Sequence, residues 1–317
     1  MRGVWLALGL VLGIAWGCET NERGPSADGG GPVSPSSDAA PPMNAPFTHF
    51  MAVHCDPGPG ATPQEQFTTL EAMVEYADVR SLKLTIMLTA QWAAYIAADD
   101  DRRRRVLGWG DAGHELAGHH HSVYHPGTWD GYSDFAEAER LEILGPRGAR
   151  TPYVGTLADW TDVVQGLVPA VRAGCGNGER DKRVIPPALV YDTCPGFYTT
   201  DRQPLGTRLD GADPYAGQSD FVLVGTTDGI ERRFLNHAII GGPFMEDAMA
   251  AYDTVDSGAY GVVVHTKEAD LASIQRWMDH VVEANKGTSA TVSEIVMSGR
   301  LPERVLADDV FNRVYPE

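Results

Sequence analysis

The chain lacks a hydrophobic run long enough to cross a bilayer. Its most apolar segment, residues 4–16, is shorter than the roughly 20 apolar residues that a transmembrane helix needs. The segment follows one basic residue, Arg2, and ends in Gly17-Cys18. A short apolar core with a basic start is typical of an export signal. We therefore interpret residues 1–18 as a signal peptide.

Basic residues are scarce as well. Lys and Arg total 25 against 43 Asp and Glu, which gives a formal net charge of −18. Such a surface repels nucleic acid and other anionic polymers, so we expect no nucleic-acid partner. The sequence also has no internal repeat and no glycine-rich loop of the kind that binds phosphates.

Only four cysteines are present. Cys18 follows a small residue at the end of the signal segment and resembles the acylated cysteine of a lipoprotein; an ordinary cleaved signal peptide is the alternative. Residues 19–46, rich in Gly, Pro, Ser and Ala, predict a disordered tether. We therefore expect an exported lipoprotein of a bacterial cell envelope, on its periplasmic or surface side, which contacts the membrane through the lipid anchor only.

The three other cysteines are an odd number for an oxidising compartment. Cys175 and Cys194 flank a polar, Gly-containing segment and make the favoured disulfide. Cys55 is then left as a thiol, although a disulfide between Cys55 and either partner remains an alternative.

Strand and helix patterns alternate along residues 47–317. Phe50–Val53 predicts a strand, Thr62-Pro63-Gln64-Glu65 predicts the start of a helix, and Leu82–Thr89 predicts a second strand. Further strands are expected at residues 188–191, 221–224 and 260–264. This alternation favours one α/β domain, either a barrel or a doubly wound sheet, in which functional groups collect at the carboxyl ends of strands.

Histidines cluster in one short segment, which contains His119, His120, His121 and His125. Neutral imidazoles two to four residues apart can converge on one divalent cation, and a carboxylate from another strand can complete the set. Asp56 follows the first predicted strand, and His265 ends the last one. A solvated, His-rich loop is the alternative interpretation.

The segment from Gly113-His114-Glu115 to His125-Pro126 resembles the second motif of the polysaccharide deacetylases, the family-four carbohydrate esterases. Two histidines spaced H-(S/T)-x-x-H bind the metal in that motif. His121 and His125 have this spacing, but the loop carries about two extra residues, so His119 with His125 is the other possible pair. The resemblance implies a single distorted (β/α) barrel.

Three other segments resemble motifs of that family. In His54-Cys55-Asp56, Asp56 takes the metal-binding position and Cys55 the place of the catalytic base, for which His54 or Asp56 itself could substitute. Arg150-Thr151-Pro152-Tyr153 resembles the third motif, whose Arg orients the base; an ordinary loop is the alternative. Val262-Val263-Val264-His265 resembles the last, which makes His265 the general acid, with a strand-end cap as the alternative.

Together these motifs imply a metal-dependent hydrolase, with zinc as the expected cation. It would remove acetyl groups from N-acetylated sugars of a cell-wall or extracellular polysaccharide. Cys55 at the place of a base leaves two alternatives open. One is a catalytically impaired barrel that binds glycan, and the other is an O-acetyl esterase.

Overall fold

The computed structural model describes residues 47–56, 62–149, 151–177, 186–193, 200, 213–227, 229–266 and 268–306. The predicted signal peptide with Cys18 and the predicted tether lie outside these residues, as do Arg150 and Cys194. In the described part, no helix combines the length and the apolar character needed to cross a bilayer.

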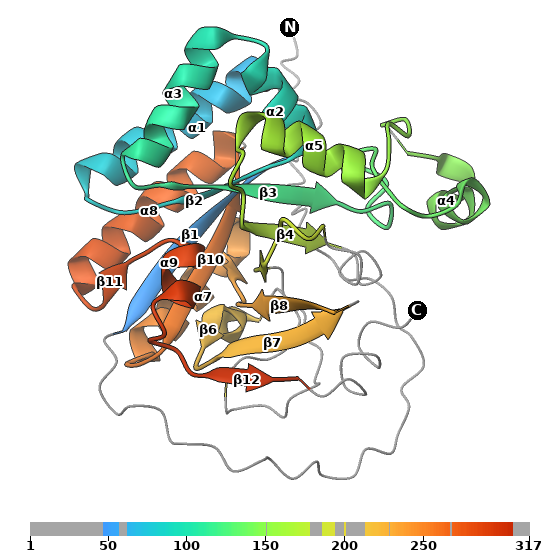
Figure 1. Cartoon of the computed structure of the whole chain (residues 1–317). Helices are drawn as coiled ribbons and strands as arrows, with labels where there is room; N and C mark the ends of the chain where they lie inside the picture. Colours follow the sequence, from blue (N-terminus) through green and yellow to red (C-terminus); the bar gives the residue numbers. More distant parts are fainter. Residues whose placement is uncertain are drawn as a thin grey trace, which may run out of the picture.

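The described domain is built on one curled sheet of 12 strands, in the order β12-β7-β8-β5-β4-β3-β2-β1-β10-β6, with β11 beside β1 and β9 beside β10 (Figure 1). From β8 to β10 in this order, neighbouring strands run parallel. No pairing joins the outermost strands β12 and β6 over the residues described, so the sheet is an open, distorted barrel. The strands are β1 (Thr48–Cys55), β2 (Thr85–Leu88), β3 (Glu115–His121), β4 (Ala173–Asn177), β5 (Tyr191–Asp192), β6 (Gln218–Ser219), β7 (Val222–Thr227), β8 (Ile230–Phe234), β9 (Ala238–Ile239), β10 (Ala259–His265), β11 (Thr288–Ser289) and β12 (Glu303–Val305).

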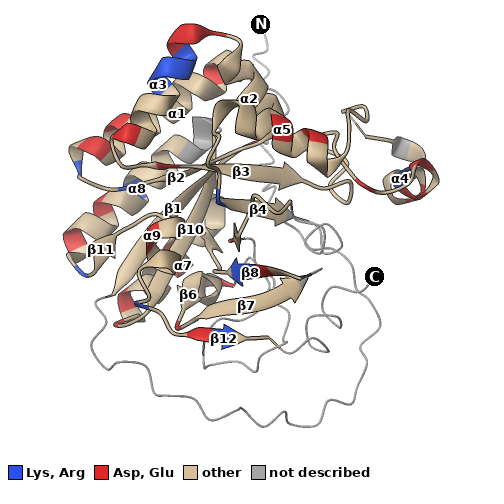
Figure 2. Ribbon diagram, viewed as in Figure 1, with Lys and Arg blue, Asp and Glu red and all other residues tan. Residues whose placement is uncertain are grey.

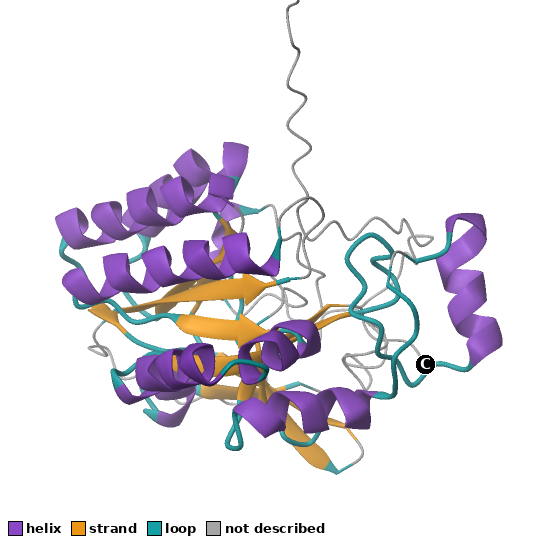
Figure 3. Cartoon of the chain, turned by 90° about the horizontal axis from the view of Figure 1, so that it is seen from above, coloured by secondary structure: helices purple, strands orange, loops and turns teal. Residues whose placement is uncertain are grey.

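Helices pack around this sheet (Figure 3). The longest two lie side by side, where Tyr76 and Arg80 at the end of α1 both contact Asp279 of α8, at 2.9 and 2.7 Å. Helix α4 projects away from the sheet (Figure 1). The helices are α1 (Pro63–Val79), α2 (Ala90–Ala97), α3 (Asp100–Asp111), α4 (Glu137–Leu144), α5 (Leu157–Leu167), α7 (Met245–Thr254), α8 (Glu268–Ala284) and α9 (Val292–Met297).

The central strands are buried on both faces. Charged residues lie mainly on the helices, and β1, β2 and β10 carry none (Figure 2). Along β1, Met51 and Val53 pack into the core beneath the helices, while Phe50 and Ala52 pack into a second core on the inner face. A parallel strand covered on both faces is expected to be apolar throughout rather than alternating.

Strand register brings the predicted site residues to one edge of the sheet. His54 of β1 is in register with His265 of β10, and His119 of β3 is in register with Cys175 of β4. Because all these strands are parallel, their carboxyl ends meet at the same edge. Strand β3 extends to His121 and thus contains three of the four clustered histidines.

Candidate metal centre

Asp56 is the first residue after β1, and the start of α2 holds its backbone. The Trp92 indole Nε1 donates to the Asp56 carbonyl oxygen at 3.0 Å, and the Thr89 hydroxyl donates to the Cys55 carbonyl oxygen at 3.0 Å. The side chain of Asp56 is nearly fully buried. These contacts fix the turn from which its carboxylate reaches the inner face of the sheet.

His119 and His121 both face the Asp56 carboxylate. Alternate residues of a strand share one face, and the inner face of β3 carries these two histidines. His119 Nε2 lies 2.8 Å from Asp56 Oδ1, and His121 Nε2 lies 3.1 Å from the same oxygen. His120 lies on the opposite face, where its Nδ1 bonds to Asp130 at 2.9 Å.

Each of the two histidines is oriented through its other nitrogen. His119 Nδ1 lies 2.8 Å from the Cys175 carbonyl oxygen. Since a carbonyl can only accept, His119 donates from Nδ1 and keeps a lone pair on Nε2 when neutral. His121 Nδ1 lies 2.9 Å from the Thr128 hydroxyl. Such contacts behind a ligand nitrogen are typical of metal-binding histidines.

The three residues fit a divalent cation. Their ligand atoms lie within 4.8 Å of one another, and all three residues are buried. Asp56 Oδ1 and His119 Nε2 lie at ion-pair distance, 2.8 Å, but are poorly aligned for a hydrogen bond. Burial would raise the pKa of Asp56, but the histidines that face it outweigh burial and hold that pKa well below its usual range. One carboxylate with two imidazoles is a donor set that suits zinc and similar ions.

His125 contacts the ring of His121 and is not one of the candidate ligands. Its ring centroid is 5.9 Å from that of His121. In the described parts of the chain, the groups of ligand atoms within 4.8 Å of one another do not include it. Burial, followed by the charge of His121, lowers the pKa of His125 to about 4. The structure thus places both competing histidines, His119 and His121, beside Asp56, and places His125 behind His121.

His265 occupies the other side of the carboxylate. It is the last residue of β10, and its Nε2 lies 3.4 Å from Asp56 Oδ2. Its side chain is 12% exposed, more than that of His119 or His121. One oxygen of Asp56 therefore faces the candidate metal ligands and the other faces His265.

Cys55 does not face this site. Its side chain packs in the core beneath the helices, and burial raises the pKa of its thiol well above the usual range. His54, one residue earlier, lies on the inner face with its ring stacked on His119 at a centroid distance of 4.0 Å. Burial, and then the charge of His119, lowers the pKa of His54 well below its usual range.

One buried histidine close to His54 escaped the sequence analysis. His237 lies before the two-residue strand β9, and its ring centroid is 5.4 Å from that of His54. No strand or loop motif in the sequence marks this position. Arg150, predicted to orient the base, lies outside the described residues.

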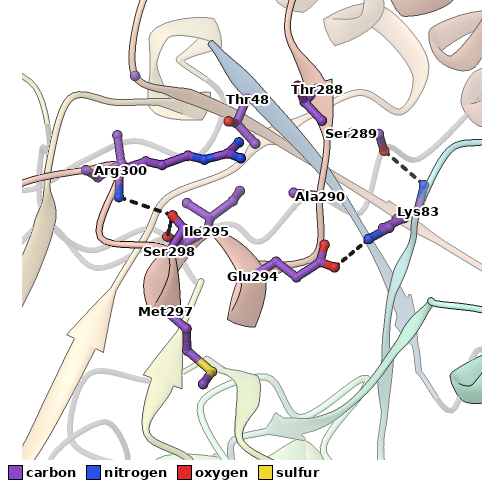
Figure 4. Close-up of a pocket in the computed structure, with 12 residues that line it drawn as sticks. Thr48, Lys83, Thr288, Ser289, Ala290, Glu294, Ile295, Met297, Ser298 and Arg300 are labelled. Atoms are coloured by element: carbon purple, nitrogen blue, oxygen red, sulfur yellow. Dashed lines mark hydrogen bonds and ion pairs between the residues drawn. The ribbon is translucent and has the colours of Figure 1, made fainter. Parts of the chain in front are cut away.

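A cavity of about 400 Å³ lies at the opposite end of the strands (Figure 4). Thr48, the first residue of β1, lines it together with Arg300 and the ion pair of Lys83 with Glu294. Its described lining residues include no histidine and no cysteine, so the cavity is separate from the candidate metal centre.

No family model matches the chain, and a search of curated proteins finds no match by sequence. Solved structures do match. One, from Mycobacterium smegmatis and described as a polysaccharide deacetylase, aligns at 12% identity over 87% of this chain and 99% of its own, with a TM-score of 0.52. Another of the same description, from Pseudomonas aeruginosa PAO1, aligns at 11% identity over 80% of this chain and 91% of its own, with a TM-score of 0.50. The chain therefore has the fold of the polysaccharide deacetylases, which confirms the fold predicted from its sequence.

Proposed function

We propose that the protein is a metal-dependent hydrolase that removes acetyl groups from N-acetylated sugars of a cell-wall or extracellular polysaccharide. The observation that carries this proposal is the arrangement around Asp56. One carboxylate oxygen faces His119 and His121, and the other faces His265, at the carboxyl edge of a polysaccharide deacetylase fold.

Asp56, His119 and His121 would hold the cation, which we propose to be zinc. When bound, it would supply Lewis acidity toward an amide carbonyl and toward water. The Cys175 carbonyl and the Thr128 hydroxyl keep the two imidazoles aimed at the cation position. His125 could join the set only if its ring moved toward Asp56.

His265 would donate a proton to the departing nitrogen of the sugar. It is the most exposed of the three histidines that face Asp56, so a substrate can reach it. Cys55 cannot take the proton of the attacking water, because its thiol faces away. Asp56 Oδ2 is better placed for this step than His54, whose side chain is completely buried beneath His119. We propose, from the motif alone, that Arg150 orients the base.

An O-acetyl esterase is the second candidate function. With Cys55 turned into the core, the candidate ligand group of described residues contains one carboxylate, that of Asp56, which would have to serve as metal ligand and base together. Esters need a less demanding base than amides. Comparing the rates on O-acetylated and N-acetylated oligosaccharides distinguishes the two functions.

The decisive experiment measures bound metal and acetate release from N-acetylglucosamine oligomers. We expect activity that a chelator abolishes and added Zn²⁺ restores, and that Asp56→Asn eliminates. The matched control is Asp253→Asn, because Asp253 also faces a histidine, His280, at 2.9 Å, but on the surface. If the protein bound metal but released no acetate from N-acetylated or O-acetylated oligosaccharides, it would instead be a barrel that binds glycan without cleaving it.

The setting of the enzyme is also a proposal. We propose that Cys18 is acylated and that residues 19–46 tether the catalytic domain, residues 47–317, to a bacterial envelope membrane. Mass spectrometry of the N-terminus of the full chain from a bacterial host tests this. Cleavage without an added acyl group would show an ordinary signal peptide.

A further inference from the structure

A second group of ligand atoms lies beside the Asp56 set. One atom each from His54, His119 and Cys175 lie within 4.8 Å of one another, and all three residues are buried. The His54 ring stacks on His119, while Cys175 is in register with His119 on the neighbouring strand. The three side chains thus share the inner face of the sheet.

His54 is the unusual member of this group. Its side chain is completely buried, and neither ring nitrogen has a hydrogen-bond partner. Buried polar atoms are almost always satisfied by protein, water or an ion, so an unsatisfied imidazole points to a group that binds there. Its neighbours within reach are a second imidazole and a sulfur atom, which are ligands for zinc and similar ions.

The state of Cys175 decides whether this set can bind. Cys175 is disulfide-bonded in the structure. A sulfur in a disulfide has no thiolate charge to offer, and the thiolate is the form that binds metals. The sequence predicts Cys194 as its partner, which lies outside the described residues.

We propose that opening the Cys175 disulfide creates a second metal site, in which the Cys175 thiolate joins His54 and His119 around a divalent cation such as Zn²⁺. In the opening step each sulfur gains one electron and one proton from a dithiol, which becomes a disulfide itself. The cation then displaces the proton of Cys175. Nitrogen and sulfur ligands of tetrahedral zinc lie roughly 3.5 Å apart, so atoms that are now within 4.8 Å of one another need to close by about 1.3 Å at most.

The second site competes with the first for His119. Its imidazole faces Asp56 in the disulfide-bonded state, and the same residue is needed to complete the thiolate site. Reduction therefore draws His119 away from Asp56 and weakens metal binding there. The thiolate site rests on this geometry alone, whether or not the protein is a hydrolase.

Cobalt titration of the full chain tests the proposal, because only thiolate ligands give Co²⁺ an intense near-ultraviolet charge-transfer band. We expect no such band from the oxidised protein. A trialkylphosphine opens the disulfide by taking oxygen from water to become the phosphine oxide, which leaves two thiols. The band should then appear with one Co²⁺, and His54→Ala should weaken its binding about tenfold or more.

Cysteine variants identify the sulfur. Cys175→Ser should abolish the band, and Cys55→Ser should keep it, since Cys55 is a buried thiol on the other face. If Cys194 is the disulfide partner, Cys194→Ser should show the band without reductant. This variant keeps the proposal testable even if Cys175→Ser does not fold. A folded, reduced protein without the band, or a band that survives Cys175→Ser, overturns the proposal.

Discussion

His119 Nε2 and Asp56 Oδ1 face each other across 2.8 Å in the interior, at ion-pair distance but poorly aligned for a hydrogen bond. A bound cation would satisfy both. We expect His119→Ala and His121→Ala each to weaken zinc binding by about tenfold or more, at least as much as loss of a residue that supports a metal ligand commonly does. His125→Ala should weaken it less, because His125 lies outside the set.

Isothermal titration with Zn²⁺ measures these affinities in the disulfide-bonded protein. His280→Gln is the matched control, since His280 also pairs with a carboxylate but on the surface. If His125→Ala lost as much affinity as His121→Ala, the pair inferred from the motif spacing would hold the metal after a movement of the loop.

Thr128 should affect zinc affinity although it is not itself a candidate metal ligand. Its hydroxyl lies 2.9 Å from His121 Nδ1, so Thr128→Val leaves the imidazole free to turn. We expect zinc affinity to fall roughly tenfold, in the range known for residues that support metal ligands. Thr128→Ser keeps the hydroxyl and should restore the affinity. Equal affinity in Thr128→Val and wild type would show that packing alone orients His121.

Local patterns in the sequence predicted several elements of this structure. The helix start at Thr62 has the expected capping box, with the Thr62 hydroxyl accepting from Glu65 N at 3.2 Å and Glu65 accepting from Thr62 N at 2.7 Å. His265 ends β10 as predicted. A cap and a strand end each depend on residues only a few positions apart.

The arrangement of side chains around Asp56 could not be predicted from local patterns, because it depends on pairing between strands that are far apart in the sequence. The histidine segment belongs to β3 because residues 118–121 pair with β4, more than 50 positions along the chain. Once that strand is extended, its twofold alternation places His119 and His121 inward and His120 outward. The same alternation turns Cys55 toward the helices, because Met51 and Val53 already face them.

His49 should make the fold sensitive to acid. It lies on β1, where burial lowers its pKa to about 4. Its unfolded pKa is about 6.5, so between these values the unfolded state binds the proton and the folded state does not. The free energy of unfolding therefore falls as the pH drops through this window, by about 3 kcal/mol from this residue at pH 4.

Urea unfolding of wild type and His49→Gln between pH 7.5 and 4.5 measures this effect. Both proteins share the other titrating groups, so the wild type should lose more stability than the variant on acidification. Parallel losses would mean that His49 becomes protonated in the folded state as well. The protonated Nδ1 would then donate to the Tyr252 hydroxyl oxygen, 3.4 Å away, because that hydroxyl donates its own proton to the Lys286 carbonyl oxygen.

Gly118 links the core beneath the helices to the candidate metal centre. A Cβ at this position would lie 2.7 Å from the buried ring of Trp160, whose Nε1 donates to the His119 carbonyl oxygen at 3.2 Å. Gly118→Ala must displace either the ring or β3, which costs about 1–3 kcal/mol by overpacking. Because His119 follows directly in the strand, zinc affinity should fall as well.

Gly166→Ala provides the matched control for that substitution. Gly166 lies on the same helix as Trp160, and a Cβ there meets no atom within 4 Å. Alanine in a helix is favoured over glycine by up to about 1 kcal/mol, so this variant should be as stable as wild type or more so, with unchanged zinc affinity. Thermal unfolding and zinc titration of both variants separate the two effects. If Gly118→Ala lost stability but kept full zinc affinity, the Trp160 contact would support the strand without positioning His119.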